Sequence, residues 1–247
     1  INPPIVVPMG EYQRRIYDFI EKKYMDAMMG EGEPDLSSKF KAALVQARMI
    51  RLMQAASDPA MLRTPLFEFM EDDECPAEAY QAIDDADVLK SIMEYEAIET
   101  PSKYLAVERL VNQITKDGGK VVIWATFIHT IHGIKEYLES KGIRCQELYG
   151  AIPVEKEGAN DDSEEQILTR EKIVRAFQSE DCPFKVIIAN PFAVAESISL
   201  HKACHNAIYL ERSFNAAHFV QSKDRIHRYG LKAGTKTNYY YILSEDS

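Results

Sequence analysis

Short apolar runs alternate with helical patterns through the second half of the chain, and this alternation limits the possible folds more than any other feature. The runs occupy residues 121–125, 143–148, 184–189, 207–210 and 239–243. Strands that are buried on both faces read as continuous apolar runs, and parallel strands are joined by helical crossovers. The pattern therefore predicts an α/β fold, in which a parallel sheet is covered by helices on both faces.

Three helices are expected between these runs. The first ends at Gly142. The second covers about residues 166–178, after a polar loop at residues 150–165. The third covers about residues 215–228, and Gly230 stands just beyond it, in the position typical of the glycine that follows a helix.

The first part of the chain shows helical spacing instead. Apolar residues recur every three or four positions within 12–25 and again within 36–56. The turn residues Ser57-Asp58-Pro59 end the second of these helices. We therefore predict two domains, which are a mostly helical region at residues 1–100 and an α/β domain at residues 101–247.

Charge is distributed very unevenly. The chain carries 29 Lys+Arg and 39 Asp+Glu, and a net charge of −10 taken alone argues against nucleic-acid binding. However, residues 68–99 hold 12 acidic side chains and one lysine, whereas residues 200–238 hold seven basic and two acidic ones. We expect a loop at residues 71–74 followed by a weakly amphipathic helix, and we interpret the acidic segment as a solvated connector between packed parts. The alternative is that it docks on the basic stretch and blocks DNA until activation.

The most specific stretch runs from Gln221 to Gly230, with the sequence Q-S-K-D-R-I-H-R-Y-G. On a helix, its positions i, i+3, i+4 and i+7 share one face, and they are Gln221, Asp224, Arg225 and Arg228. Two guanidinium groups on one face suit a phosphate whose oxygens gain charge during transfer, and Asp224 or Gln221 could hold one of them. On charge pattern alone, an ordinary surface helix with an i,i+4 ion pair is the alternative.

This stretch resembles the sixth conserved motif of SNF2-type ATPases of helicase superfamily 2, Q-x-x-D-R-x-H-R-x-G-Q. Further resemblances follow in the family's order, at Leu52–Pro59, Ser102–Leu105, Val121–Phe127, Leu148–Gly150 with Arg170, Ile173 and Phe177, Ser197–Leu200, and Phe214–Ala216. Several motifs in one order are a stronger indication than any single one. Departures also occur: Leu231 replaces the final Gln, Phe214 replaces a Trp, and residues 190–197 lack the family's glycines.

The resemblance implies that the α/β domain is the C-terminal, second RecA-like lobe of such an ATPase. Arg225 and Arg228 would then reach the phosphates of ATP, with Arg228 as the arginine finger and Asp224 in the same nucleotide-binding group. Gln221 would couple this cleft to the first lobe. The DNA backbone would meet four residues near strand ends, where ligands of open α/β sheets bind beyond the carboxyl ends of the strands: Thr126, Gly150, Asn190 and Lys202.

For the whole protein, the resemblance implies an ATP-dependent double-stranded DNA translocase or helicase. Its partners would be double-stranded DNA and the N-terminal RecA-like lobe, with a nuclease domain or defence-system proteins as further possibilities. Residues 196–202 and 215–218 look like those of prokaryotic SNF2-like proteins from restriction and phage-defence systems. The alternative is a RecA-like interaction or DNA-binding module that has lost its ATPase activity.

Other features bound the location and the chemistry. No apolar run approaches the roughly 18 residues of a membrane-spanning helix, and four widely spaced cysteines suggest reduced thiols in the cytoplasm. Two histidine groups, His129 with His132 and His201 with Cys204 and His205, could ligate a metal, but neither forms a clear four-ligand set, so no metal is expected. Tyr239-Tyr240-Tyr241 could stack bases, although its place on a strand favours sheet packing.

The chain contains neither a G-x-x-x-x-G-K-[ST] loop nor a D-E-x-H box. In the family these motifs lie on the first lobe, which would bind most of the ATP and the Mg²⁺, so we expect this chain to be a fragment of a longer protein. We predict that the chain alone shows no DNA-stimulated ATP hydrolysis, because it has no phosphate cradle and no metal-holding acid. A phosphate-release assay with and without duplex DNA tests this, and robust turnover would overturn the lobe assignment.

Overall fold

The computed structural model describes residues 2–29, 38–63, 85–154, 168–194, 198–212, 216–228, 231 and 234–247. The chain divides into two compact units. The sheet unit contains residues 1–5 and 106–243, and the helical unit contains residues 6–105 and 244–247.

A six-stranded sheet in the order β1-β6-β5-β2-β4-β3 forms the centre of the α/β part. Its strands are β1 (Ile5–Val7), β2 (Val121–Trp124), β3 (Cys145–Leu148), β4 (Val186–Ala189), β5 (Asn206–Tyr209) and β6 (Asn238–Ser244). Strand β2 pairs in parallel with β4 and β5, β3 pairs in parallel with β4, and β5 with β6. All four residues of β2 and of β4 are buried, as their uninterrupted apolar sequences predict. The predicted α/β fold with a parallel sheet is confirmed, whereas β1 was not predicted.

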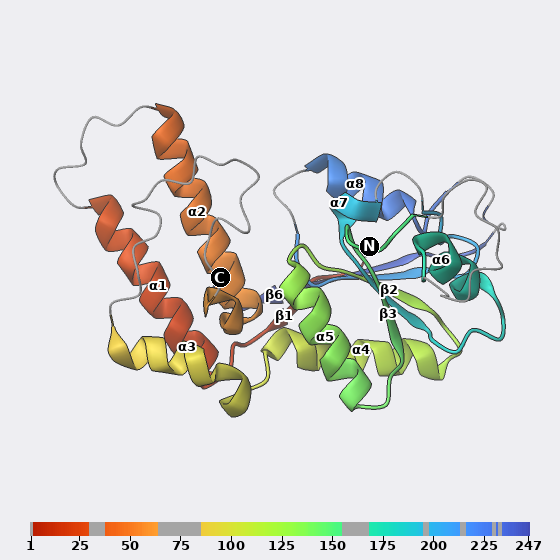
Figure 1. Cartoon of the computed structure of the whole chain (residues 1–247), viewed down its shortest axis with the longest axis horizontal. Coiled ribbons are helices and arrows are strands. Elements are labelled where there is room, and N and C mark those ends of the chain that lie inside the picture. Colours follow the sequence, from red (N-terminus) through yellow and green to blue (C-terminus); the bar gives the residue numbers. More distant parts are fainter. Residues whose placement is uncertain are drawn as a thin grey trace. The chain divides into compact units, whose positions relative to one another are not determined.

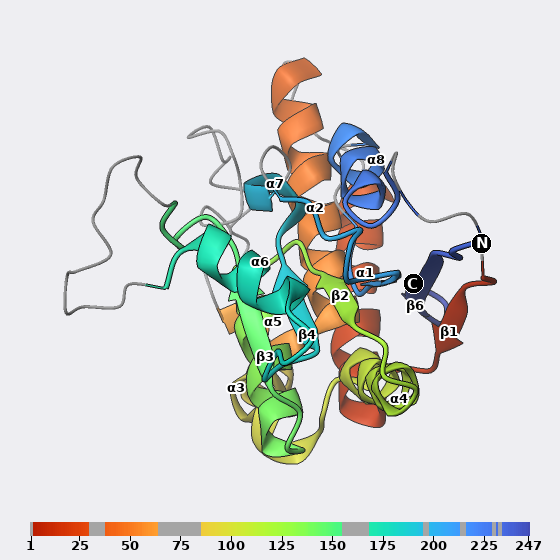
Figure 2. The same ribbon diagram turned by 90° about the vertical axis from the view of Figure 1, so that its right-hand side faces the viewer.

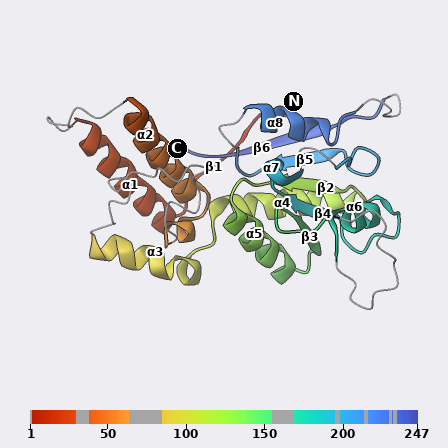
Figure 3. The same ribbon diagram turned by 45° about the horizontal axis from the view of Figure 1, so that its top comes forward.

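Helices cover both faces of the sheet (Figures 1 and 3). One face carries α4 (Ser102–Lys116) and α5 (Ile128–Ser140), and the other carries α6 (Arg170–Gln178) and α8 (Ala216–Asp224), with the short α7 (Pro191–Val194) nearby. Successive side chains of a strand point to opposite faces of the sheet, so alternate residues pack against the helices on one face. Val122 and Trp124, for example, pack with Ile173 and Phe177 of α6.

Two of the predicted helix boundaries are wrong. Helix α6 begins at Arg170 rather than near Gln166, because the hydroxyl of Thr169 accepts a hydrogen bond from the Lys172 amide and caps the helix there. Helix α8 ends at Asp224 rather than Arg228. The predicted loop at 150–165 falls mostly on residues 155–167, which lie outside the described residues, as does Gly230.

The helical unit confirms the predicted helical character of the first part of the chain. It contains α1 (Glu11–Met29), α2 (Ser38–Ser57), the 3₁₀ helix η1 (Pro59–Arg63) and α3 (Ala86–Ile98). Figure 2 shows α1 and α2 from a second side. A core of apolar side chains from all four elements joins them, including Ile16, Ala55, Leu62, Ile92 and Tyr95. Among the helices that the structure describes, none combines the length and the hydropathy needed to cross a lipid bilayer.

The acidic segment is more than a connector where the structure describes it. Residues 64–84 lie outside the described residues, but α3 packs into the core of the helical unit through Val88, Ile92 and Tyr95. The carboxylate of Asp85 caps its first turn by accepting bonds from two amides. The acidic side chains of α3 thus belong to the outer face of a packed helix, and the solvated-connector interpretation is wrong for this part.

Glu99 joins the end of α3 to the start of α1. Its carboxylate accepts bonds from the amides of Tyr12 and Gln13, both at 3.1 Å, and from the hydroxyl of Tyr95 at 3.2 Å. Helix α1 follows Gly10, which has no side chain to cap it, so a carboxylate from 87 positions away fills that role. A Cβ added at Gly10 would lie 2.3 Å from the carboxylate carbon of Glu99, so the cap also requires glycine there.

We predict that Glu99→Ala destabilises the helical unit by about 1–2 kcal/mol, because two amides in the first turn of α1 lose their acceptor. Urea unfolding followed by far-ultraviolet circular dichroism measures the change. Glu94→Ala is the matched control, because Glu94 is exposed on the same helix and takes no part in the cap. Equal midpoints for the two variants would contradict the capping role.

Candidate functional site

Three of the residues predicted to contact DNA lie just beyond the carboxyl ends of neighbouring strands. Thr126 follows β2, Gly150 follows β3 and Asn190 follows β4. Because these strands are parallel, their carboxyl ends share one edge of the sheet, which we call the carboxyl edge. The structure therefore brings these three residues to the same edge, where open α/β sheets bind ligands.

A buried carboxylate organises this edge. Glu211 follows β5 and is 5% exposed. One of its oxygens accepts bonds from the amides of Thr126 at 2.9 Å and Phe127 at 3.0 Å, and the other accepts the hydroxyl of Thr130 at 2.7 Å. These donors form the start of α5, where Phe127 at the N-cap has no capping side chain of its own. Glu211 therefore caps α5 and ties the end of β5 to the end of β2.

Asn190 adds a second tie at the same edge. Its side-chain amide donates to the carbonyl of Thr126 at 2.7 Å, and its side-chain oxygen accepts from the amide of Phe192 at 2.8 Å. The side chain of Asn190 and the backbone groups of Thr126 are thus bonded within the protein, whereas the buried hydroxyl of Thr126 has no hydrogen-bond partner. Gly150 remains exposed, with open space where a Cβ would stand, and its carbonyl accepts a bond from Arg170 at 2.8 Å.

Lys202 does not join the other three. It precedes β5, so it lies towards the amino ends of the strands, and its grouping with carboxyl-end residues is wrong. Its neighbour His201 shares a 2.6 Å hydrogen bond with Ser199. Burial lowers the pKa of His201, and the positive charges of Arg228 and then Lys202 lower it further. Lys202 and Arg228 therefore both act on His201, and Lys202 contributes to the same positively charged region as Arg228.

The predicted arginine face is not a helix face in the structure. After Asp224 the chain tightens into turns, in which the amides of Arg225 and Ile226 bond carbonyls three residues earlier. The carbonyl of Arg225 accepts a bond from the amide of Leu200 at 2.9 Å, and Ile226 is fully buried in the core. Packing of residues 225 and 226 against the sheet thus ends α8 earlier than helical spacing predicts. Gln221, Asp224 and Arg228 are exposed, whereas Arg225 turns inwards.

Arg225 is a buried cation with an incomplete set of partners. The residue is 7% exposed, and one terminal nitrogen of its guanidinium donates to the carbonyl of Ile198 at 3.3 Å. Its Nε has no hydrogen-bond partner. Burial lowers the pKa of Arg225, the charge of Arg228 lowers it further, and Asp224 partly offsets these effects. Neither Gln221 nor Asp224 makes a described hydrogen bond or ion pair with it, although the sequence suggested that one of them could hold a guanidinium.

The remaining candidates have structural roles where they are described. Tyr241 is 9% exposed and stacks on Tyr209, with ring centroids 5.1 Å apart, and Tyr239 packs against the same core, which confirms sheet packing for both. Cys204 is buried, and burial raises the pKa of its thiol to about 12. Within the described ranges no three His, Cys, Asp or Glu side chains gather as a metal site would require.

Sequence reasoning missed Glu211 as a member of the site. We predict that Glu211→Ala destabilises the sheet unit by about 2–3 kcal/mol, because it leaves two amides at the start of α5 without an acceptor. Glu211→Gln should cost less, because the amide oxygen still accepts. The only tryptophan, Trp124, is fully buried at the end of β2, so its fluorescence reports unfolding of this unit. Glu136→Ala, at an exposed position on α5, is the control. Equal unfolding midpoints for Glu136→Ala and Glu211→Ala would show that Glu211 does not stabilise the start of α5.

Comparison with known proteins matches this arrangement to one family and one fold. Residues 102–230 match the family described as the helicase conserved C-terminal domain. The C-terminal part of the Fun30 ATPase domain superposes with a TM-score of 0.65 at 19% identity, over 100% of this chain and 86% of that one. The Sulfolobus solfataricus SWI2/SNF2 ATPase core in complex with dsDNA gives 0.60 at 15% identity, over 99% of this chain and 41% of that one. The C-terminal domain of the Sulfolobus protein gives 0.59 at 13% identity, over 99% of this chain and 79% of that one.

These structural matches confirm the predicted fold, a RecA-like lobe with a preceding helical region. The chain spans less than half of the Sulfolobus ATPase core, so its likeness is to one part of that protein. The family match extends over more than half of the sequence. The chain therefore belongs to the helicase conserved C-terminal domain family.

Proposed function

We propose that this chain is the C-terminal lobe of an SNF2-type, ATP-driven DNA translocase or helicase, to which it supplies the arginine finger and contacts to the DNA backbone. The observation that carries the proposal is the buried guanidinium of Arg225. It has no described carboxylate partner, and its Nε has no hydrogen bond. A buried cation without a counter-ion is costly, so the site is electrostatically incomplete until an anion arrives.

A phosphate group is the anion that suits this place. Arg228 is exposed beside Arg225, and Lys202 lies within electrostatic reach of the same neighbour, His201. Guanidinium groups bind phosphate oxygens with paired donors and keep their charge throughout the reaction. Arg228 is free to extend from the surface to a nucleotide held by another lobe, and we assign it as the finger. Arg225 would contribute charge from behind it, and Gln221 and Asp224 would line the exposed side.

The ATP and its Mg²⁺ would be held mainly by the N-terminal RecA-like lobe, which carries the phosphate loop in this superfamily. Arg228 would stabilise the charge that develops on the phosphate oxygens as the bond to the leaving ADP breaks. Closing of the two lobes around ATP and reopening after its hydrolysis would move the protein along DNA.

The carboxyl edge of the sheet would face the DNA backbone. The Sulfolobus ATPase core, which shares this fold, forms a complex with double-stranded DNA. Gly150 is the exposed member of the carboxyl edge, whereas Thr126 and Asn190 would act chiefly by holding the edge in shape. Backbone contacts carry no base sequence, so binding should be sequence-independent and sensitive to salt.

The cellular setting is a further part of the proposal. Three described cysteines, Cys145, Cys182 and Cys204, are free thiols, which supports a reducing cytoplasmic compartment. A role in a restriction or phage-defence system rests on the sequence resemblance alone.

We predict that Arg228→Ala in the complete protein lowers ATP turnover by at least about a hundredfold, because the arginine finger supplies much of the transition-state stabilisation. DNA affinity should stay nearly unchanged, since the carboxyl edge is intact. Steady-state hydrolysis and fluorescence anisotropy with labelled duplex measure the two effects. Lys236→Ala, which also removes an exposed cation, is the matched control. Unaltered hydrolysis by Arg228→Ala, or no hydrolysis by the unmodified complete protein, would favour the alternative of a non-catalytic binding module.

A further inference from the structure

The segment Ile198–Leu200 supports Arg225 and is itself held from two sides. From one side, Arg225 bonds it twice: its guanidinium donates to the carbonyl of Ile198 at 3.3 Å, and its own carbonyl accepts from the amide of Leu200 at 2.9 Å. From the other side, the side-chain amide of Gln178 donates to the carbonyl of Ser199 at 2.9 Å. The segment therefore connects Arg225 to the last residue of α6.

We propose that Gln178 is a positioning residue for the arginine pair, Arg225 and Arg228, because it holds the segment Ile198–Leu200 against α6 and thereby fixes Arg225. Gln178 is not among the residues whose motifs resemble those of SNF2-type ATPases. The kinetic part of this inference rests on the function proposed above, whereas its structural part does not.

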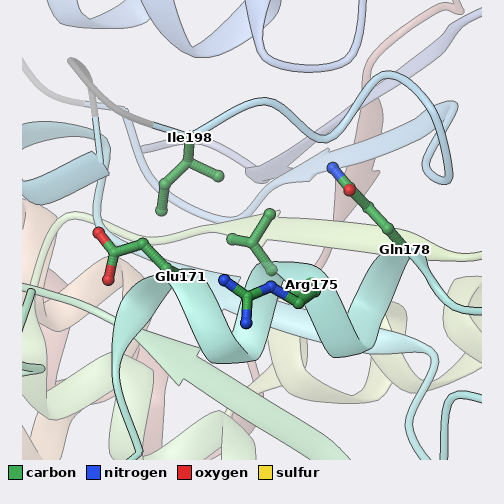
Figure 4. Close-up of a pocket in the computed structure, with 5 residues that line it drawn as sticks. Glu171, Arg175, Gln178 and Ile198 are labelled. Atoms are coloured by element: carbon green, nitrogen blue, oxygen red, sulfur yellow. The ribbon is translucent and has the colours of Figure 1, made fainter. Parts of the chain in front are cut away.

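Apolar packing and the Gln178 bond hold different parts of this segment. Ile198 and Leu200 are buried in the same core as Ile173 and Phe177 of α6. Figure 4 shows Glu171, Arg175 and Gln178 along one side of α6, with Ile198 on the segment that crosses above them. A pocket of about 230 Å³ lies between these residues. Burial of the side chains of Ile198 and Leu200 carries no direction, whereas the bond from Gln178 fixes the orientation of the Ser199 carbonyl between them.

Helix α6 itself is well anchored and can serve as a fixed support. Ile173 and Phe177 are buried in the core beneath it. At its first residue, Arg170 donates to the carbonyls of Gly150 and Ile152, both at 2.8 Å. A side chain at the other end of such a helix can hold the segment in one place, and a shift of about 1 Å in a charged group near the reacting atoms costs catalysis heavily.

Ligand binding by Arg225 would compete with its bond to Ile198, and Gln178 would then hold the segment in place of that bond. A phosphate on the unpartnered side of the guanidinium would pull Arg225 towards itself and compete with the long 3.3 Å bond to Ile198. The segment would then depend on the Leu200 amide and on Gln178 for its position. The contribution of Gln178 should therefore be greatest in the transition state, and its loss should lower kcat more than it changes KM.

The structural part is tested on this chain by amide hydrogen exchange. Gln178→Met keeps the length of the side chain and removes the donor. We expect the amide of Leu200 to exchange at least about tenfold faster, because the segment opens more often. Gln113→Met makes the same change at an exposed position on α4 and should leave that amide unaffected. An unchanged exchange rate in Gln178→Met would overturn the inference.

The kinetic part is tested on the complete protein. Gln178→Met and the donor-lacking Gln178→Glu should both lower kcat for ATP roughly tenfold, with little change in KM or in DNA affinity. Gln178→Lys keeps a donor and should recover most of the activity. These outcomes are interpreted only if Arg228→Ala strongly lowers hydrolysis. In that case, a wild-type kcat in Gln178→Met would overturn the positioning role, and so would a low kcat in Gln178→Lys. If Arg228→Ala leaves hydrolysis intact, the proposed function fails instead, and the Leu200 exchange still decides whether Gln178 holds the segment.

Discussion

The carboxylate of Glu211 is the interaction on which the carboxyl edge depends. Hydrogen bonds between strands fix their spacing and register, but they do not fix the loops and helix starts beyond the strand ends. Glu211 does so, because one side chain from the end of β5 receives two amides and a hydroxyl from the start of α5. Asn190 extends the tie from β4 to the same place. The chain segments beyond β2, β4 and β5 are thereby held to one another by hydrogen bonds within the protein.

The same bonds decide what this edge can offer to a ligand. A helix start with unpaired amides attracts phosphate, but the amides of Thr126 and Phe127 already bind an internal anion. The hydrogen bonds of Glu211 therefore leave these amides unavailable to a ligand, and exposed positions such as Gly150 remain accessible at the edge. The arginine pair lies elsewhere, after α8, with Lys202 nearby. Helix α6 relates the two areas, because Arg170 at its start bonds the Gly150 loop and Gln178 at its end bonds Ser199.

Sequence predicted those parts of the molecule that local pattern determines. Apolar runs such as Val121–Trp124 became buried parallel strands, and the turn at Ser57-Asp58-Pro59 ended α2. Prediction failed where distant partners decide the outcome. Helical spacing extended α8 through Arg228, but the bond between Arg225 and Leu200 and the burial of Ile226 end it at Asp224. Similarly, Glu211 is one acid among many in the sequence, and only the sheet brings it to the start of α5.

Buried charges elsewhere in the described residues show why the environment of Arg225 is unusual. Asp58 accepts bonds from the Ala60 amide and the Tyr104 hydroxyl, and Glu211 accepts bonds from two amides and a hydroxyl. Arg225 has one long bond and an unpartnered Nε. A stability role alone would favour replacing such a group with an apolar one. Its unmet bonding capacity beside a second, exposed arginine instead supports the proposal that Arg225 binds an anion such as a phosphate.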